Sequence, residues 1–437
     1  MAFKGIEGCV PLIHGSQGCS TYVRRYLISH FKEPVDIASS NFTEEATIFG
    51  GGPNLKLALA NVANQYKPLS IGISTTCLSE TIGDDVPQII NDFRKETPGL
   101  NHVGLAHAST PSYCGTHVDG YHQAVVAVIN QMTGGKIASN KLVVMPGMLS
   151  PADYRYLKEI FESLKVEAIF LPDLSETLDN AHWDEYKRIP EGGTTRKELS
   201  EVGGAAGYLQ FGDVLNRGID AFAIKRKNIL TPGTALENKF GLKGATIGLP
   251  MGINATDRMF SAIEMLTGAS LTDKYKKERG RLIDAYTDGH KYVFGKRAVV
   301  YGEEDFVIGL TEFLSEIGIE PVLIATGGES SAFKSIIESK LNRKHKPEIL
   351  TGADFEVIAE YCRESKPDIM IGHSKGYYIA RELNIPLIRV GFPIHDRLGG
   401  QRVLHIGYEG AHRLFELIAN ALIECKQSNS PVGYKYM

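Results

Sequence analysis

The stretch "RAVVYGEEDFVIGLTEFLSEIGIEPVLIATGG", from Arg297 to Gly328, contains two short apolar runs that are separated by a longer segment. Each run is rich in β-branched residues and ends in a small-residue turn, which predicts a buried strand. The segment between the runs has its apolar residues at helical spacing. A strand, a helix and another strand in this order predict a parallel pair that is covered by the helix.

The same theme recurs in two regions upstream and again near the C-terminus. The further predicted strands are "LSIGISTTC" (69–77), "HVGLAHAST" (102–110), "KLVVMPGM" (141–148), "EAIFLPDLS" (167–175), "ATIGLPMGI" (245–253), "DIMIGHSKG" (368–376) and "PLIRVGFPI" (386–394). Between them, helices are predicted to begin at Pro53 and at Ser150-Pro151. Because the strands are continuous apolar runs, we expect sheets that are covered on both faces.

A chain of 437 residues is too long for one hydrophobic core. We predict an α/β fold with three doubly wound domains that are built on mainly parallel sheets. The glycine-rich "MTGGKIASNK" and the charged helix "DKYKKERGRL" mark the boundaries. The predicted domains are therefore residues 1–135, which carry most of the cysteines, 136–285 and 286–437.

Composition excludes several classes of protein. With 43% hydrophobic and 22% charged residues, the chain has the profile of an ordinary globular protein. The net charge of -4 predicts neither a nucleic-acid nor a membrane partner, and no apolar run is long enough to span a bilayer. The N-terminus lacks a secretory pattern, which predicts a cytoplasmic location. Without a GxxxxGKS/T loop or a GxGxxG after a strand, we expect neither nucleotide hydrolysis nor a standard dinucleotide site.

The cysteines carry the strongest chemical signal in the sequence. They stand at positions 9, 19, 77, 114, 362 and 425. Four of them lie in the first 114 residues, which in an intracellular chain favours metal or redox chemistry over disulfides. Buried free thiols are the alternative, which is favoured for Cys362 and Cys425 and balanced against the first for Cys114.

Two of these cysteines flank a histidine in "GCVPLIHGSQGCSTY", from Gly8 to Tyr22. We expect this stretch to be a glycine-punctuated loop that carries Cys9, His14 and Cys19. Its glycines permit the close backbone approach that a cluster-binding loop needs. His14 either orients the loop through a hydrogen bond or is a satisfied structural histidine, and the second interpretation is favoured.

Further candidates follow the ends of two predicted strands. Cys77 closes the first of them, and Ser112 and Cys114 follow the second. Because function gathers at the carboxyl ends of parallel strands, these side chains are expected to face one crevice, with the Cys9–Cys19 loop folded over it. Converging thiolates suit an iron–sulfur cluster. No CxxC pair is present, so zinc-ribbon and bacterial ferredoxin spacings are excluded.

Three other turns carry weaker signals. "FGGGPN" (49–54) is either an anion site at a helix N-terminus or a tight structural turn, and the turn is favoured. Asp84 and Asp85 are expected to cap a helix rather than to line a charged interface. His373 and Lys375 follow a predicted strand and are an unspecific candidate for contact with an anion or a partner.

The sequence resembles the beta-type subunits of the nitrogenase component 1 family. The motifs that carry this resemblance cover essentially the whole chain in order: "LIHGSQGCSTYVRRYLISHFKEPVDIASSNFTEEATIFGG", "STTCLSETIGDDV", "TPSYCGTHVDGY", "FLPDLSETLD", "IPEGGTT", "LIRVGFPIHDRLGG" and "IGYEGA". The HGSQGC and STTC motifs together are quite specific. The resemblance implies paired subunits that each contain three α/β domains, which agrees with the organisation predicted above.

The resemblance also implies a site and partners. Cys19 and Cys77 match cysteines that ligate an iron–sulfur cluster between subunits, either an eight-iron P-type or a four-iron cluster, and Ser112 matches a serine that can ligate the oxidised cluster. Cys9 is a spare thiol or a ligand peculiar to this branch. An alpha-type subunit would complete a heterotetramer and hold the catalytic cofactor, so no catalytic residue is expected in this chain. An ATP-hydrolysing iron protein would supply electrons.

Two features leave alternatives open. The family's first beta-subunit cysteine lies in a C-x-P-x-G-A segment, and "MAFKGIEG" is similar to the residues just after that segment, so that ligand either precedes Met1 or is not used. The scaffold subunit on which the iron–molybdenum cofactor matures shares HGSQGC but often lacks the second cysteine. Cys77 and Ser112 favour the reductase, whereas "FLPDLSETLD", "GFPIHDRLGG" and the absent segment favour the scaffold. A cluster-free supporting module is the third hypothesis.

Overall fold

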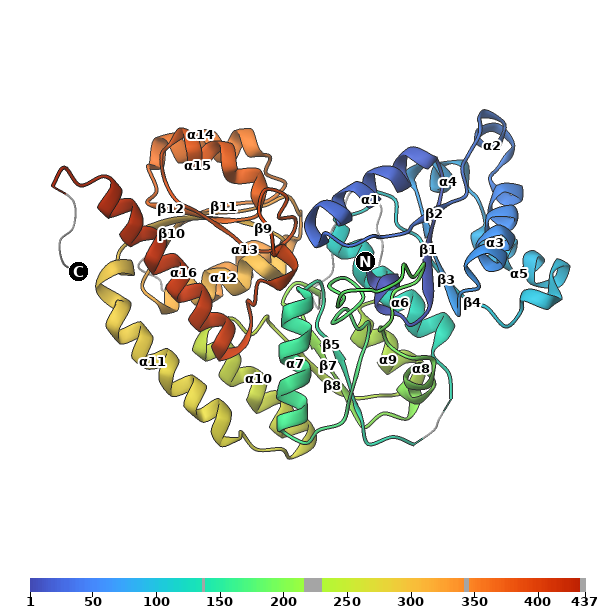
Figure 1. The fold of residues 1–437 in the computed structure, drawn as a ribbon, viewed down its shortest axis with the longest axis horizontal. Coiled ribbons are helices and arrows are strands. Elements are labelled where there is room, and N and C mark those ends of the chain that lie inside the picture. The colour runs from blue at the N-terminus through green and yellow to red at the C-terminus, as the bar shows by residue number, and fades with distance from the viewer. Residues whose placement is uncertain (136–137, 216–229, 342–345, 433–437) are drawn as a thin grey trace. The chain divides into compact units, whose positions relative to one another are not determined.

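The computed structural model describes residues 1–135, 138–215, 230–341 and 346–432, and its strands form three sheets (Figure 1). Every strand pair with a defined register is parallel. Helices alternate with the strands along the chain. The predicted α/β class with parallel sheets is therefore confirmed.

The chain divides into two compact units. The first comprises the described parts of Met1–Glu162, Val166–Gln210 and Lys227–Ala245, and the second comprises those of Ser163–Lys165, Phe211–Arg226 and Thr246–Met437. The first sheet lies wholly within the first unit and the third sheet wholly within the second. The three-domain division with boundaries after residues 135 and 285 stays a prediction.

The first sheet has the strand order β2-β1-β3-β4. Its elements are β1 (Cys9–His14), α1 (Gln17–Phe31), β2 (Ala38–Ser39), α2 (Glu44–Phe49), α3 (Gly52–Tyr66), β3 (Ser70–Thr75), α4 (Cys77–Ile82), α5 (Val86–Glu96), β4 (Gly104–Ala108) and α6 (His117–Met132), with short 3-10 turns η1 (Ala2–Gly5) and η2 (Pro98–Leu100). Helices α3 and α5 pack on one face, while α6 and η1 lie on the other (Figure 1). Both faces are therefore covered, as predicted.

One expectation for this sheet was wrong. The stretch Cys9–His14 is not a loop but the strand β1, which pairs with β2 on one side and β3 on the other. Its apolar residues Val10 and Leu12 are buried against α3 in the core. Burial of these side chains outweighs the local preference for a turn that Pro11 and the flanking glycines suggest.

The outer edge of the first sheet is closed by a side chain. The amide of Gln131, on α6, accepts a hydrogen bond from the backbone N–H of His107 (2.9 Å) and donates one to its carbonyl (2.8 Å). His107 lies on β4, the edge strand. Gln131 thus takes the place that a neighbouring strand would occupy.

The second sheet has the order β6-β5-β7-β8. Its strands are β5 (Leu142–Met145), β6 (Ala168–Phe170), β7 (Gly207–Phe211) and β8 (Gly244–Ile247), and the helices between them are α7 (Pro151–Ser163), α8 (Arg196–Glu201) and α9 (Pro232–Phe240), with a 3-10 turn η3 (Val202–Gly204). Helix α7 begins at Pro151, and the Ser150 hydroxyl accepts a hydrogen bond from the N–H of Asp153 (3.1 Å). The predicted start of this helix is therefore confirmed.

The third sheet has the order β11-β10-β9-β12-β13. Its elements are α10 (Gly252–Thr267), α11 (Asp273–Val293), β9 (Arg297–Gly302), α12 (Glu304–Glu316), β10 (Glu320–Thr326), α13 (Ser331–Lys340), β11 (Glu348–Leu350), α14 (Phe355–Ser365), β12 (Ile369–Gly372), α15 (Tyr377–Glu382), β13 (Leu387–Arg389) and α16 (Gly407–Ser428), with η5 (Ser374–Gly376) and η6 (Gly400–Arg402). The stretch from Arg297 to Gly328 forms β9, α12 and β10 with the two strands parallel, as predicted. Helices α14 and α15 cover one face of this sheet, and α12 and α13 cover the other (Figure 1).

No helix within the described ranges combines the length and the apolar character that a membrane crossing requires.

Candidate functional site

Cys77 and Ser112 meet at the carboxyl edge of the first sheet. Strand β3 ends at Thr75, Thr76 caps the next helix in a capping box with Ser79, and Cys77 is the first residue of α4. The Cys77 Sγ lies 2.9 Å from the Ser112 Oγ and accepts a hydrogen bond from the Ser112 backbone N–H at 3.2 Å. The expectation that these two residues lie together is therefore met in the structure.

The loop that carries Ser112 is tied to the end of β3. The N–H of Thr110 donates to the Thr75 hydroxyl oxygen (3.0 Å), and the Thr110 hydroxyl donates to the Thr75 carbonyl (2.9 Å). Both bonds join chain segments that are 35 residues apart. They place Ser112 opposite the first turn of α4.

The Cys77 thiol is prepared to ionise. Partial burial raises its pKa, but hydrogen bonds from the Ser112 hydroxyl and from the backbone N–H groups of Ser112 and Tyr113 lower it by more, so the net pKa is lowered. Hydrogen bonds to a charged form favour that form. Because the thiolate is the form that binds metals, Cys77 has the chemistry of a metal ligand.

Cys19 lies near the same edge, on the helix that follows the neighbouring strand β1. Strand β1 pairs with β3 in a register that places His14 opposite Thr75, and both strands are followed by a helix. Cys19 is the third residue of that helix, α1, where it is exposed and its Sγ lies 3.6 Å from the Ser16 Oγ. The helices that bear Cys19 and Cys77 therefore both begin at the carboxyl edge of the first sheet.

The structure does not bring Cys9 to this group. Cys9 is the first residue of β1, so it lies at the amino end of the strand, opposite Ser70 of β3. It is buried, and burial raises the pKa of its thiol to about 11. This environment is that of a spare, un-ionised thiol.

The other cysteines are also free thiols. Cys114 is half-buried and its N–H donates to the Pro111 carbonyl at 3.1 Å, within the Ser112 loop. Cys362 is buried in α14, and burial raises its pKa to about 11, which agrees with its expected role in the core. Cys425 is half-buried on α16.

His14, Asp84 and Asp85 each make specific contacts near the edge. His14 is buried and its ring contacts Ser40 and Asp84. Asp85 caps α5 by accepting a hydrogen bond from the Gln88 N–H at 3.0 Å, as expected. Asp84 instead accepts one from the N–H of Gly51, the N-cap of α3, at 2.9 Å. The anion at the "FGGGPN" turn is therefore a carboxylate of the protein itself.

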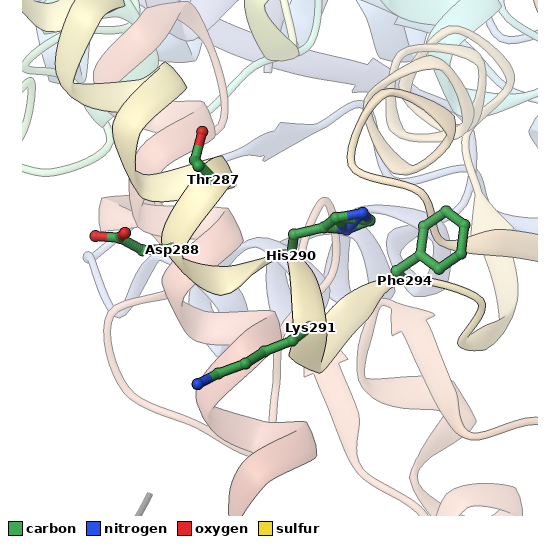
Figure 2. Close-up of a pocket in the computed structure, with 5 residues that line it drawn as sticks. All are labelled: Thr287, Asp288, His290, Lys291 and Phe294. Carbon is green, nitrogen blue, oxygen red and sulfur yellow. The ribbon is translucent and has the colours of Figure 1, made fainter.

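No complete metal site is formed by the described residues alone: none of them gather as three or more His, Cys, Asp or Glu side chains around one point. A separate hollow with a volume of about 480 Å³ lies at the end of α11 (Figure 2). It is lined by Thr287, Asp288, His290, Lys291 and Phe294. None of the predicted site residues line it, so it adds nothing to the group at the first sheet.

An exposed apolar stripe on α1 was not predicted. Tyr22, Val23 and Tyr26 are 65%, 43% and 42% exposed, and they stand three, four and seven residues after Cys19. This spacing places them on the helix face that also carries the exposed thiol. The signal was present in "CSTYVRRY", where apolar residues repeat at helical spacing from the cysteine.

Fold and site together define a class: a parallel-sheet α/β protein that presents thiols at the carboxyl edge of its first sheet. The chain belongs to the family of nitrogenase component 1 type oxidoreductases, which it matches over residues 1–423, and within that family it is a beta-type subunit. The predicted family is confirmed.

Relatives support this assignment over nearly the full length. The nitrogenase molybdenum-iron protein beta chain of Clostridium pasteurianum is 37% identical over 428 residues, which are 97% of this chain and 90% of that protein. The beta chain of Methanococcus maripaludis is 34% identical over 437 residues, which are 97% of this chain and 91% of that protein. Both are similar to this chain across all three sheets.

Solved structures agree. The structure of nitrogenase Cp1 at pH 6.5 matches with a TM-score of 0.93 and 35% identity, covering 100% of this chain and 93% of that one. A second chain, from nitrogenase Cp1 at pH 5, matches with a TM-score of 0.67 at 15% identity, and this likeness concerns the fold alone.

Proposed function

We propose that this chain is the electron-transfer subunit of a nitrogenase or nitrogenase-like component 1. In this proposal Cys19 and Cys77 are its thiolate ligands to an iron–sulfur cluster of P-type that is shared with an alpha-type partner. The observation that carries the proposal is the Cys77–Ser112 pair, in which a thiol with a lowered pKa lies 2.9 Å from a hydroxyl. Such a pair offers two adjacent ligand atoms to one iron.

The donor set fits a shared cluster. Cys19 is exposed and Cys77 is half-buried, so neither thiol is closed off inside the unit. Cubane-type clusters need about four protein ligands, which is more than this edge supplies among the described residues. The remaining ligands would come from the partner, as in a cluster that lies between two subunits.

The exposed stripe beside Cys19 supports the position of the partner. Contiguous exposed apolar side chains mark interaction surfaces, and Tyr22 and Tyr26 are residue types that are enriched in interfaces. A partner seated on this face of α1 would cover Cys19. Such burial would also exclude water from the cluster. Solvent exposure is one of the factors that set the reduction potential of an iron–sulfur centre.

The residues of this chain then hold and tune the centre rather than transform a substrate. A bound cluster supplies one-electron transfer, here from an ATP-hydrolysing iron protein toward a catalytic cofactor in the alpha-type partner. The Ser112 backbone N–H donates to the Cys77 sulfur, and such a hydrogen bond adjusts the potential. The complex would be a cytoplasmic heterotetramer.

Replacement of Cys19 tests the proposal. The complex with the alpha-type partner is purified anaerobically, and iron and acid-labile sulfide are measured per chain together with the EPR spectrum. Cys19→Ala is expected to remove more than half of the iron that the wild-type complex holds at the shared site. Cys425→Ala, which removes a half-buried thiol from α16, is the matched control and should leave the iron content unchanged.

Two outcomes would change the interpretation. Equal iron in the wild-type and Cys19→Ala complexes would refute the cluster assignment. A cluster that leaves the complex when an apo-acceptor protein is added would favour the cofactor scaffold over the reductase, because a scaffold holds its cargo only in transit.

A further inference from the structure

The His14 side chain connects segments that are distant in the sequence. It is 0% exposed, its Nδ1 lies 3.0 Å from the Ser40 Oγ, and its Nε2 lies 3.1 Å from the Asp84 Oδ2. Ser40 follows β2, and Asp84 follows α4. Both ring nitrogens therefore have partners, which a buried imidazole needs to avoid an unsatisfied polar atom.

The hydrogen bonds assign one tautomer to the ring. Burial lowers the pKa of His14 by more than the neighbouring Asp84 carboxylate raises it, so the ring is neutral. Since the carboxylate only accepts, Nε2 carries the proton and donates to Asp84. Nδ1 then accepts from the Ser40 hydroxyl, whose oxygen accepts in turn from the Gly15 N–H at 2.9 Å. Every donor in this chain of hydrogen bonds has an acceptor.

At its Asp84 end, the chain of hydrogen bonds extends to the start of helix α3. The Asp84 carboxylate accepts from the N–H of Gly51, where α3 begins, at 2.9 Å from Oδ1 and 3.2 Å from Oδ2. The ring of Phe42 packs edge-on against the His14 ring, with centroids 4.9 Å apart. A Cβ at Gly51 would lie 2.1 Å from the Phe42 ring, so only glycine fits between Phe42 and Asp84.

The backbone of His14 connects the same residue to the cysteine-bearing helix α4. The His14 carbonyl accepts from the Thr76 N–H at 3.1 Å and from the Ser79 hydroxyl at 2.9 Å. Thr76 and Ser79 form the capping box that starts α4 at Cys77. On the other side, His14 ends β1, and α1 with Cys19 starts three residues later. His14 thus lies between the two thiol-bearing segments.

The order Ser40–His14–Asp84 is also that of a hydrolytic triad, but the geometry excludes a nucleophile. The Ser40 side chain is buried, and its oxygen already accepts the Gly15 N–H. A nucleophilic serine needs an oxygen that a substrate can reach. The network therefore holds the backbone rather than catalysing hydrolysis.

From this geometry we propose that His14, together with Ser40 and Asp84, is a positioning residue that holds the Cys19 and Cys77 segments in their cluster-binding arrangement before the cluster enters. The inference rests on the proposed function above and deepens it. Mutation of outer-shell residues that orient metal ligands commonly lowers metal affinity by about tenfold or more.

Three substitutions of His14 separate the arms of the network. His14→Gln keeps a donor at the ε position for Asp84, His14→Asn keeps a polar atom at the δ position for Ser40, and His14→Ala removes both. In the metal-free chain, hydrogen exchange of the peptides 14–19 and 75–80 should be faster for the alanine variant. In the anaerobic complex, a ferrous chelator should remove iron about tenfold faster from that variant than from wild type.

The glutamine variant provides the rescue. The Asp84 arm fixes the residue that follows the Cys77 helix α4, whereas the Gly15 N–H donates to Ser40 without help from the imidazole. His14→Gln should therefore recover most of the iron retention and His14→Asn should recover less. The matched control is Tyr121→Phe, which removes a buried hydrogen bond to Tyr154 (2.9 Å) from the same unit. It should lower thermal stability without a change in iron loss.

The outcomes distinguish this inference from the function on which it rests. If Cys19→Ala loses iron and His14→Ala retains it as wild type does, the positioning role is wrong and the cluster assignment stands. If neither variant loses iron, the cluster assignment itself fails. Iron loss from Tyr121→Phe equal to that from His14→Ala would overturn the positioning role in favour of general destabilisation.

Discussion

The two ends of the first sheet carry the same pair of residue types, a cysteine and a serine, with opposite properties. At the amino end, Cys9 lies beside Ser70, both are buried, and burial raises the pKa of the thiol to about 11. At the carboxyl end, Cys77 lies beside Ser112, and the pKa of its thiol is lowered. The difference comes from solvation and from backbone N–H donors, not from the serine alone.

Strand polarity decides which end can be functional. At the carboxyl end, the loop after β4 supplies the backbone N–H groups of Ser112 and Tyr113 that donate to the sulfur of Cys77, the first residue of the helix after β3. At the amino end, the turns that enter the strands are covered by η1, and Gly8 packs against Leu69. The same thiol chemistry is therefore suppressed at one end and supported at the other.

The largest expected effect is the difference in iron content between two single variants, Cys77→Ala and Cys9→Ala. Cys77→Ala should remove most of the iron from the complex while leaving the α/β fold intact, because it deletes the ligand that we propose at the accessible end. Cys9→Ala should retain the iron and lose about 1–2 kcal/mol of stability, as expected of a small deletion in a core. Iron analysis and chemical denaturation measure the two quantities, and iron loss from Cys9→Ala would erase the contrast between the ends.

A glycine at the carboxyl end should be the next most sensitive position. A Cβ on Gly15 would lie 2.1 Å from the Thr76 Oγ1, so Gly15→Ala must displace the cap of α4. We expect a loss of about 2–3 kcal/mol in the free energy of unfolding. Gly18→Ala is the control, since the nearest atom to its Cβ is 3.8 Å away, and it should stabilise the chain by about 0.5 kcal/mol. Equal effects at both positions would contradict the packing argument.

A cap close to the edge, but not facing the thiols, should have a smaller effect. Asp85→Ala removes the hydrogen bond to the Gln88 N–H that starts α5, and we expect it to lower stability by about 1 kcal/mol. Iron retention should stay at the wild-type level, because Asp85 does not contact His14 or either cysteine segment. A loss of iron from Asp85→Ala comparable to that from His14→Ala would show that residues outside the Ser40–His14–Asp84 network also hold the cysteine segments.

The smallest expected effect is a shift in a titration. Ser112→Ala removes the hydroxyl that donates to the Cys77 sulfur, so the pKa of Cys77 should rise. Since alkylation follows the thiolate, the pH profile of iodoacetamide reaction at Cys77 in the metal-free chain should move to higher pH. Mass spectrometry of the peptide that contains Cys77 reads this directly. An unchanged profile would mean that the backbone donors alone lower the pKa.

Much of the site follows from local patterns. The apolar runs before Cys77 and Ser112 identify strands, and the rule that parallel strands end at one edge brings the two residues together. The prediction failed at Cys9–His14, where a strand of six residues contains a proline and is flanked by glycines. Strand pairing on both sides and burial of Leu12 are tertiary effects that a short window does not contain.

The network behind the site could not be predicted in the same way. His14 and Asp84 are 70 residues apart, and Ser40 is 26 residues from His14. Local rules assign Asp84 to a helix cap, and they do assign its neighbour Asp85 correctly. Only the fold shows that adjacent aspartates have different roles, one at the start of α5 and one between His14 and Gly51.

The Gln131 side-chain amide, which reaches from α6 to the edge strand β4, has a consequence for how this chain meets other chains. By pairing with both backbone groups of His107, it removes a docking point at which an extended peptide would otherwise add to the sheet. The addition of a strand from another chain is therefore disfavoured at the His107 position of the β4 edge, and so is the growth of fibrils from this edge. This single amide therefore protects the chain at His107 from edge-to-edge association, while apolar side chains on α1 stay exposed.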